Sequence, residues 1–178
     1  DEMLPIERIG GLLPYHSHVA PEVVVGALNH LIDEVGRGTP VFHEIYTRAE
    51  QQRDPTKAST GLVFFPGRAG APFALIAPGG GFSYVGSVHE GFPYALEISR
   101  RGYNAFVLRY RVGQGSGAAT EDMAAAIAYV FRQAGRLGVG TATIRCGAVP
   151  RAHGWRRPSA RTGSPASAAA TCPGRRPW

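Results

Sequence analysis

Three consecutive glycines, Gly79, Gly80 and Gly81, follow an apolar segment near the middle of the chain. Glycine loses more conformational freedom on folding than other residues, so a triple glycine indicates a backbone with unusual angles or a close approach to another group. Acyl-transfer enzymes have this requirement, because backbone N–H groups fixed in advance stabilise the oxyanion of their tetrahedral intermediate. The glycine run is therefore a candidate oxyanion-binding loop.

Two other interpretations of the glycine run remain open at this point. A loop that binds a dinucleotide phosphate has the pattern G-x-G-x-x-G and opens a helix at once. The glycines at 79, 80, 81 and 86 do not have that spacing, and no helix pattern begins directly after them. The phosphate-binding pattern G-x-x-x-x-G-K-[ST] is also absent from the sequence. A tight turn with no role in chemistry is the second alternative.

The elements around this loop alternate between strand and helix patterns. Residues 73–77 and 103–110 are continuous apolar runs, which indicate strands buried on both faces. The spacing of apolar residues predicts helices over 21–35, 92–101 and from a cap at Thr120 to Gly138, and short strands at 41–46 and 61–65 that can pair antiparallel. Such alternation predicts an α/β fold with a mostly parallel sheet and flanking helices.

Residues 77–84 (APGGGFSY) resemble the His-Gly-Gly-Gly type oxyanion loop of the esterase and lipase branch of the α/β-hydrolases, with Pro78 where histidine often stands. Residues 88–96 (VHEGFPYAL) and 101–111 (RGYNAFVLRYR) resemble the helix and the fourth strand that follow in acetyl-esterase-like members. The resemblance covers residues 60–140 and implies the N-terminal half of an α/β-hydrolase fold.

The resemblance also implies roles for single residues. The amides of Gly80 and Gly81 are the expected oxyanion donors, although the sequence leaves open which two amides between Gly79 and Phe82 point inward. Phe82 and His89 are candidates for binding the substrate. His89 is alternatively a partly exposed residue at the start of a helix. Such an enzyme needs no cofactor and no metal, and its substrate is a small carboxylic ester.

The nucleophile of this family is missing from the chain. A serine in a G-x-S-x-G motif, on a sharp turn after a strand, is required next. The sequence contains no such motif, and Ser116 in residues 114–117 (QGSG) lacks both the first glycine and the strand. The acid and histidine of the triad would come later still. We therefore expect a serine esterase family member that is itself inactive, or alternatively a non-catalytic fragment.

Residues 141–178 differ in composition from residues 1–140. They hold seven arginines, no acidic residue, both cysteines and both tryptophans, whereas residues 1–140 hold the other 12 basic residues and all 13 acidic ones. The sequence therefore predicts one α/β-hydrolase part over 1–140 and a basic, low-complexity, disordered tail over 141–178. The tail could bind nucleic acid or an acidic surface, but it lacks interleaved aromatic residues, and we expect no nucleic-acid partner.

A change of reading frame explains the tail. Starting at the junction of Ala142 and Thr143, the genetic code permits a shifted reading of Asp-Tyr-Ser-Leu-Trp-Gly-Gly-Ser-Ala-Gly, in which the codon across Val149 and Pro150 encodes the serine. This string has the form of a nucleophile strand followed by G-x-S-x-G. We therefore expect a frameshift near residues 139–142.

The remaining features of the sequence predict neither a metal site nor a membrane span. Residues 15–18 (YHSH) hold two histidines but no further partners, so no metal site is predicted. The sequence has no apolar run of about eighteen residues and no leader pattern, so we expect no membrane span and a cytoplasmic rather than secreted protein.

Arg109 and Arg111 are expected to pair with acidic residues of the following helix. Asp122 is expected to be a helix-start residue and not the triad acid.

Overall fold

The computed structural model describes residues 20–148. Its centre is a five-stranded sheet in the order β1-β2-β4-β3-β5. The strands are β1 (Phe42–Glu44), β2 (Gly61–Phe65), β3 (Pro72–Ala77), β4 (Asn104–Arg109) and β5 (Gly140–Ala148). β3 is parallel to β4 and β5, whereas β2 is antiparallel to β1 and β4. The predicted α/β class, the antiparallel pair and the parallel strands are confirmed.

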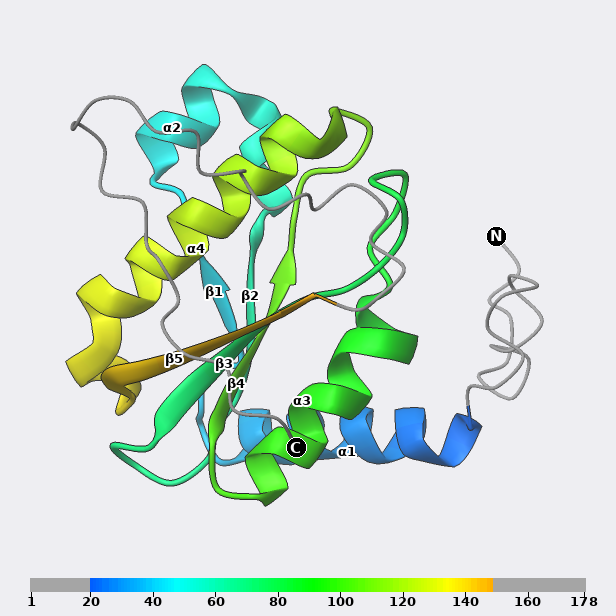
Figure 1. The fold of residues 1–178 in the computed structure, drawn as a ribbon, viewed down its shortest axis with the longest axis vertical. Coiled ribbons are helices and arrows are strands. Elements are labelled where there is room, and N and C mark those ends of the chain that lie inside the picture. Colours follow the sequence, from blue (N-terminus) through cyan, green and yellow to red (C-terminus); the bar gives the residue numbers. More distant parts are fainter. Residues whose placement is uncertain (1–19, 149–178) are drawn as a thin grey trace, which may run out of the picture.

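Helices cover both faces of the sheet (Figure 1). α1 (Pro21–Gly36) and α3 (Phe92–Arg100) lie on one face, and α4 (Gly115–Leu137) lies on the other. Successive side chains of β4 enter the two cores in turn: Phe106 and Leu108 pack in the core under α4, whereas Ala105 and Val107 pack in the core under α1 and α3. Two buried faces explain why this strand is continuously apolar from Ala105 to Leu108.

The connection between β1 and β2 is more regular than its polar sequence predicts. It contains the helix α2 (Arg48–Arg53) and the short 3₁₀ helix η3 (Pro55–Ser59). Thr47 begins α2 with a capping box, in which its hydroxyl accepts from the Glu50 amide and the Glu50 carboxylate accepts from the Thr47 amide. Asp54 then caps η3 by accepting from the Thr56 amide at 3.1 Å. Side-chain hydrogen bonds at the starts of α2 and η3 therefore stabilise this surface segment, which has no buried residue in either helix.

Two boundaries differ from the sequence prediction. α4 begins at Gly115, not after a cap at Thr120, so Asp122 lies inside the helix. Residues 141–148, which the sequence analysis places in the disordered tail, form most of β5, so that prediction is wrong for these residues. The register is irregular between Pro72 and Phe73 of β3. Residues 141–146 (TATIRC) alternate polar and apolar types, which is the period of a strand. Residues 149–178 lie outside the described residues.

Candidate active site

The glycine loop lies at the edge of the sheet where the parallel strands end. It joins β3 to the π-helical turn η4 (Ser87–Gly91), which leads directly into α3 (Figure 1). Ala77, the last residue of β3, is in register with Ala148, the last residue of β5. The end of β5 therefore lies beside the start of the loop. In open α/β sheets this edge, at the carboxyl ends of the strands, is where ligands bind.

The backbone of the loop requires glycine at one position in particular. Gly80 has a φ of 138°, and a Cβ added there would overlap the carbonyl oxygen of Tyr84. The turn is closed by the amides of Ser83 and Tyr84, which donate to the Gly80 carbonyl oxygen at 3.0 and 3.3 Å. Gly81 and Phe82 follow with φ values of 59° and 63°. Three successive positive φ angles explain why the segment is rich in glycine.

The amide of Gly79 is occupied by a carboxylate. It donates to Oε2 of Glu90 at 2.8 Å, and the Gly79 carbonyl oxygen accepts from the Gly86 amide at 2.9 Å. The amides of Gly80 and Gly81, in contrast, have no acceptor within residues 20–148. Of the candidate donors from Gly79 to Phe82, Gly79 is therefore already engaged, and the role of the Gly80 and Gly81 amides stays a prediction.

The hydroxyl of Tyr110, the residue that follows β4, holds the start of the glycine loop. Its buried hydroxyl donates to the Pro78 carbonyl oxygen at 3.0 Å and lies 3.4 Å from the carbonyl oxygens of Gly79 and Tyr84. Burial, followed by the nearby charge of Glu90, raises the pKa of Tyr110 to about 12. The hydroxyl therefore stays protonated at neutral pH and remains a hydrogen-bond donor to the loop.

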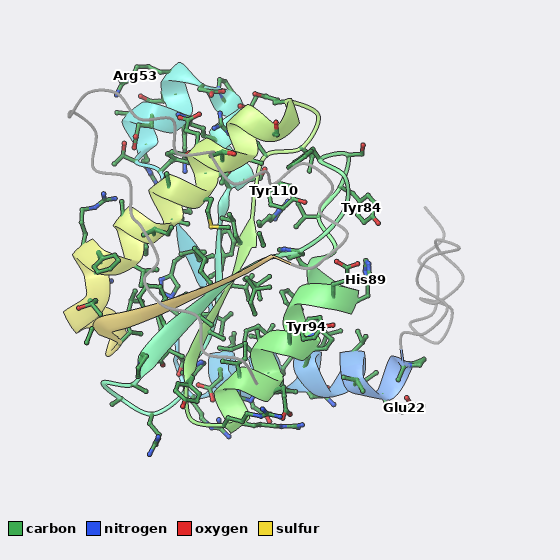
Figure 2. All side chains as sticks on the ribbon, in the orientation of Figure 1. Glu22, Arg53, Tyr84, His89, Tyr94 and Tyr110 are labelled. Carbon is green, nitrogen blue, oxygen red and sulfur yellow. The ribbon has the colours of Figure 1, made fainter. Side chains whose placement is uncertain are left out.

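The two predicted substrate-binding residues, Phe82 and His89, lie in the turn of the loop and in η4, which follows it. The ring of Phe82 packs against Tyr110 at 6.2 Å between centroids, and its carbonyl oxygen accepts from the Gly113 amide at 2.8 Å. His89 lies in η4 and stacks on Tyr84 at 6.4 Å, and Figure 2 shows both of these rings at one corner of the molecule. Their role in binding substrate stays a prediction.

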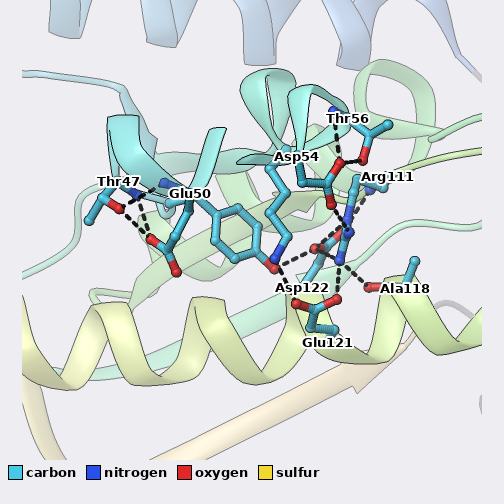
Figure 3. A network of polar contacts seen from close by, with 10 residues as sticks. Thr47, Glu50, Asp54, Thr56, Arg111, Ala118, Glu121 and Asp122 are labelled. Carbon is cyan, nitrogen blue, oxygen red and sulfur yellow. Dashed lines mark hydrogen bonds and ion pairs between the residues drawn. The ribbon is translucent and has the colours of Figure 1, made fainter. Parts of the chain in front are cut away.

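A network of ion pairs around the buried Arg111 holds the segment that follows β4 (Figure 3). The Arg111 guanidinium donates to Asp122 at 2.9 Å, to Glu121 at 2.5 Å and to Asp54 at 3.1 Å. Burial lowers the pKa of Arg111, but the hydrogen bonds to Asp122 and Glu121 outweigh it and the net change is upward. The predicted pairing of Arg111 with the following helix is confirmed, whereas Arg109 is exposed.

Asp122 is the central acceptor of this network. It is fully buried and accepts from the Arg111 amide at 2.7 Å and from the Tyr46 hydroxyl at 2.6 Å. These bonds join α4 to the end of β4 and to the segment after β1. Asp122 is therefore a structural residue, as its sequence position indicates, but inside the helix and not at its start.

Ser116 does not have the position of a nucleophile. It lies in the first turn of α4, where its carbonyl oxygen accepts from the Thr120 hydroxyl at 2.8 Å. Within residues 20–148, His, Cys, Asp and Glu side chains form no group of three or more that could hold a metal. None of the helices in that same part of the chain is long and apolar enough to cross a bilayer. The histidine pair at 15–18 lies outside the described residues.

The solved structures that resemble this chain are hydrolases. A bifunctional acetyl ester-xyloside hydrolase from Caldicellulosiruptor lactoaceticus superimposes with a TM-score of 0.50 and 26% sequence identity, over 60% of this chain and 40% of that one. The described chain carries part of the α/β-hydrolase fold. An α/β-hydrolase enzyme from a Medee basin deep-sea metagenome library is 28% identical over 49% of this chain and 40% of its own, with a TM-score of 0.45. No protein-family model and no curated protein sequence matches the chain.

The chain thus spans about 40% of the length of these solved α/β-hydrolases. Two residues of the site in this α/β-hydrolase fold, Glu90 and Tyr110, were assigned no role from the sequence. The signal for Tyr110 is a hydroxyl at the end of a buried strand, where a polar tip requires a partner. The only signal for Glu90 is its place in the turn that directly follows the glycine loop.

Proposed function

We propose that this chain is the N-terminal part of a serine esterase that hydrolyses small carboxylic esters, and that the Gly80 and Gly81 amides bind the oxyanion. The observation that supports this proposal is the conformation of the loop at the carboxyl end of β3. Its Gly80 and Gly81 amides have no acceptor in the described part of the chain. Backbone donors fixed in this way stabilise a tetrahedral intermediate without reorganising during the reaction.

In the proposed reaction this chain supplies the oxyanion donors, and the nucleophile and its base come from residues that the chain lacks. A serine attacks the ester carbonyl carbon while a histidine takes the serine proton, and the same histidine then protonates the leaving alcohol. A water that the histidine deprotonates then attacks the acyl-serine, which releases the carboxylic acid and restores the serine. The former carbonyl oxygen becomes the oxyanion that Gly80 and Gly81 would hold. Tyr110 and Glu90 would keep these amides in place through Pro78 and Gly79. The 178-residue chain supplies only this part, so we propose that it is inactive by itself.

On this proposal residues 143–148 of β5 are themselves out of frame, and the register of β5 gives the place that the shifted residues would take. Ala148 is paired with Ala77, so the next codons along the gene correspond to a position beside Pro78, where the oxyanion loop begins. The shifted codon across Val149 and Pro150 is the one that can encode the serine. A serine directly after this strand would be adjacent to the Gly80 and Gly81 amides, as the attack on a carbonyl carbon requires.

Sequencing the coding DNA across codons 135–160 tests this proposal. We expect a shifted frame that encodes G-x-S-x-G, with its serine codon across positions 149 and 150. The protein translated in that frame to its own stop codon should hydrolyse p-nitrophenyl acetate, and a serine-directed phosphonate should abolish the activity. If neither shifted frame contains G-x-S-x-G, the proposed frameshift is refuted.

A further inference from the structure

A cavity lies at the opposite edge of the sheet from the glycine loop. Its volume is about 330 Å³, which falls within the range of about 300–1,000 Å³ that small-molecule sites occupy. It lies where β2 ends, β4 begins and α4 ends. Figure 1 shows the C-terminal end of α4 far from the loop between β3 and α3. Binding in this cavity would therefore be independent of the proposed esterase activity.

One side of the cavity is fixed by contacts within the fold. Asn104 is buried, and its side chain accepts from the Gly67 amide at 2.9 Å and donates to the Ala71 carbonyl oxygen at 2.9 Å. Gly67 also lies so close to the backbone of Tyr103 that an added Cβ would overlap it. This side is therefore formed before a ligand binds, and binding would cost little in ordering it.

The walls of the cavity are mostly apolar. Phe64 stacks on Phe106 at 4.6 Å between ring centroids, which holds the Phe64 ring in place. The other apolar or aromatic lining residues are Pro40, Pro66, Tyr129 and Leu137. Such walls stabilise a ligand by about 25 cal/mol for each Å² of apolar surface that it buries. They disfavour a charged group, which would lose its water without gaining a partner.

Arg136 brings an unpaired positive charge to this cavity. It is exposed, lines the cavity and forms no ion pair in the part of the chain that the structure describes. Burial lowers the pKa of His43, another lining residue; a hydrogen bond with the Pro40 backbone opposes that change, and the charge of Arg136 adds to it. The Arg136 guanidinium therefore lies close to this wall, at the mouth of the cavity.

The other groups around the mouth also favour an anion. None of the lining residues is acidic, and Gln133, one turn before Arg136 on α4, offers a side-chain N–H donor. Arg68, which lies between two lining residues in the sequence, forms no ion pair among residues 20–148 either. The end of α4 contributes the equivalent of about half a negative charge, which is smaller than the charge of Arg136 alone.

We propose that this cavity binds a small aromatic monocarboxylate. The ring packs against Phe64 and Tyr129, and the carboxylate accepts hydrogen bonds from Arg136 and Gln133 at the mouth. A neutral aromatic molecule would leave Arg136 without a counter-charge, and a small anion without a ring would leave the apolar walls in contact with water. A second carboxylate would lie against those walls without a partner. The ligand class thus follows from one positive charge at the mouth and apolar walls behind it.

Titration calorimetry of the full 178-residue chain with phenylacetate tests this proposal. We expect saturable binding with a Kd of about 1 mM or lower, as a ligand of this size allows. Benzyl alcohol has the ring but no charge, and acetate has the charge but no ring, so each should bind about tenfold more weakly. Absence of saturable binding of phenylacetate, or equal affinity for phenylacetate and either of the other two compounds, would overturn the proposal.

Substitutions on α4 assign the site. Arg136→Gln should weaken phenylacetate about tenfold and leave benzyl alcohol unchanged, whereas Arg136→Lys, which keeps the charge, should weaken phenylacetate less. The matched control is Arg132→Gln, one turn earlier on α4 and outside the lining of the cavity, which should change neither affinity. If Arg136→Gln binds phenylacetate as the parent chain does, the ligand occupies another site and the proposal fails.

Discussion

Gly80 combines a positive φ with a close contact, so its replacement tests the geometry of the loop. A Cβ at this position would overlap the Tyr84 carbonyl oxygen, and the φ of 138° is one that residues with a side chain rarely adopt. We expect Gly80→Ala to lower the free energy of unfolding by roughly 1–3 kcal/mol, measured by urea titration.

Gly117 is the matched control for this substitution. It lies in α4 with nothing within 4 Å of an added Cβ, so Gly117→Ala gains helix propensity of about 1 kcal/mol and should stabilise the chain. Equal effects of the two alanine substitutions would contradict the loop conformation described above.

Tyr110 tests how the loop is fastened to β4. Tyr110→Phe removes the hydroxyl that donates to the Pro78 carbonyl oxygen and leaves a buried acceptor unsatisfied. The expected loss in the free energy of unfolding is about 1–3 kcal/mol, together with faster hydrogen exchange in the loop. Tyr94, which is exposed on α3, provides the control, because Tyr94→Phe should change neither quantity. Unchanged exchange in the Tyr110 variant would argue against this fastening.

At the level of elements, Asp122 joins α4 to β4 and to the segment after β1. Asp122→Asn leaves the buried charge of Arg111 without its central partner, and the expected cost is about 3–5 kcal/mol in the free energy of unfolding. Glu121→Gln, in the same network but with 53% of its side chain exposed, should cost about 1 kcal/mol or less. Similar losses in both variants would mean that the network is not buried as described.

The strands at the centre of the sheet could be predicted from sequence because burial on both faces leaves a continuous apolar run, as in residues 73–77. The helix α2 could also have been found, since Thr47 and Glu50 have the spacing of a capping box. The contact of Glu90 with Gly79 could not, because it depends on the π-helical turn η4, which has no periodic signal. β5 could also have been found, since residues 141–146 (TATIRC) alternate polar and apolar types with the period of a strand.

The unpaired outer edge of β5 affects how the whole molecule associates and unfolds. β5 pairs with β3 on one side, and no other strand among residues 20–148 pairs with its far side. Such an edge presents unpaired N–H and C=O groups that can pair with another chain. We expect the 178-residue chain to associate as its concentration rises, as measured by light scattering, and to unfold with low cooperativity. A monomer with a sharp two-state melt would contradict this expectation.

The stability of the molecule should also depend on pH through His43. The pKa of His43 in the folded chain lies below its ordinary value of 6.5, so the unfolded chain binds more protons as pH falls. Stability from this residue is complete above pH 6.5 and is lost as pH falls toward the folded pKa. The urea midpoint should therefore be lower at pH 5.5 than at pH 7.5.

The contribution of His43 to the pH dependence of stability can be separated from that of the carboxylates. The pKa values of Asp54 and Glu121 are lowered, for Asp54 mainly by the hydrogen bond from Thr56 and for Glu121 by that from Lys57, so their contributions are lost only at more acidic pH. The decrease between pH 7.5 and 5.5 should be smaller in His43→Phe. An equal decrease in the variant would assign the pH dependence to another group.

The central claim for the whole molecule is that it carries an oxyanion loop without the nucleophile that the loop serves. The most direct measurement is the hydrolysis of p-nitrophenyl acetate by the purified 178-residue chain. Our account predicts no turnover above the uncatalysed background, because the sequence has no G-x-S-x-G motif and Ser116 lies in the first turn of a helix. Clear turnover that a serine-directed phosphonate abolishes would contradict it.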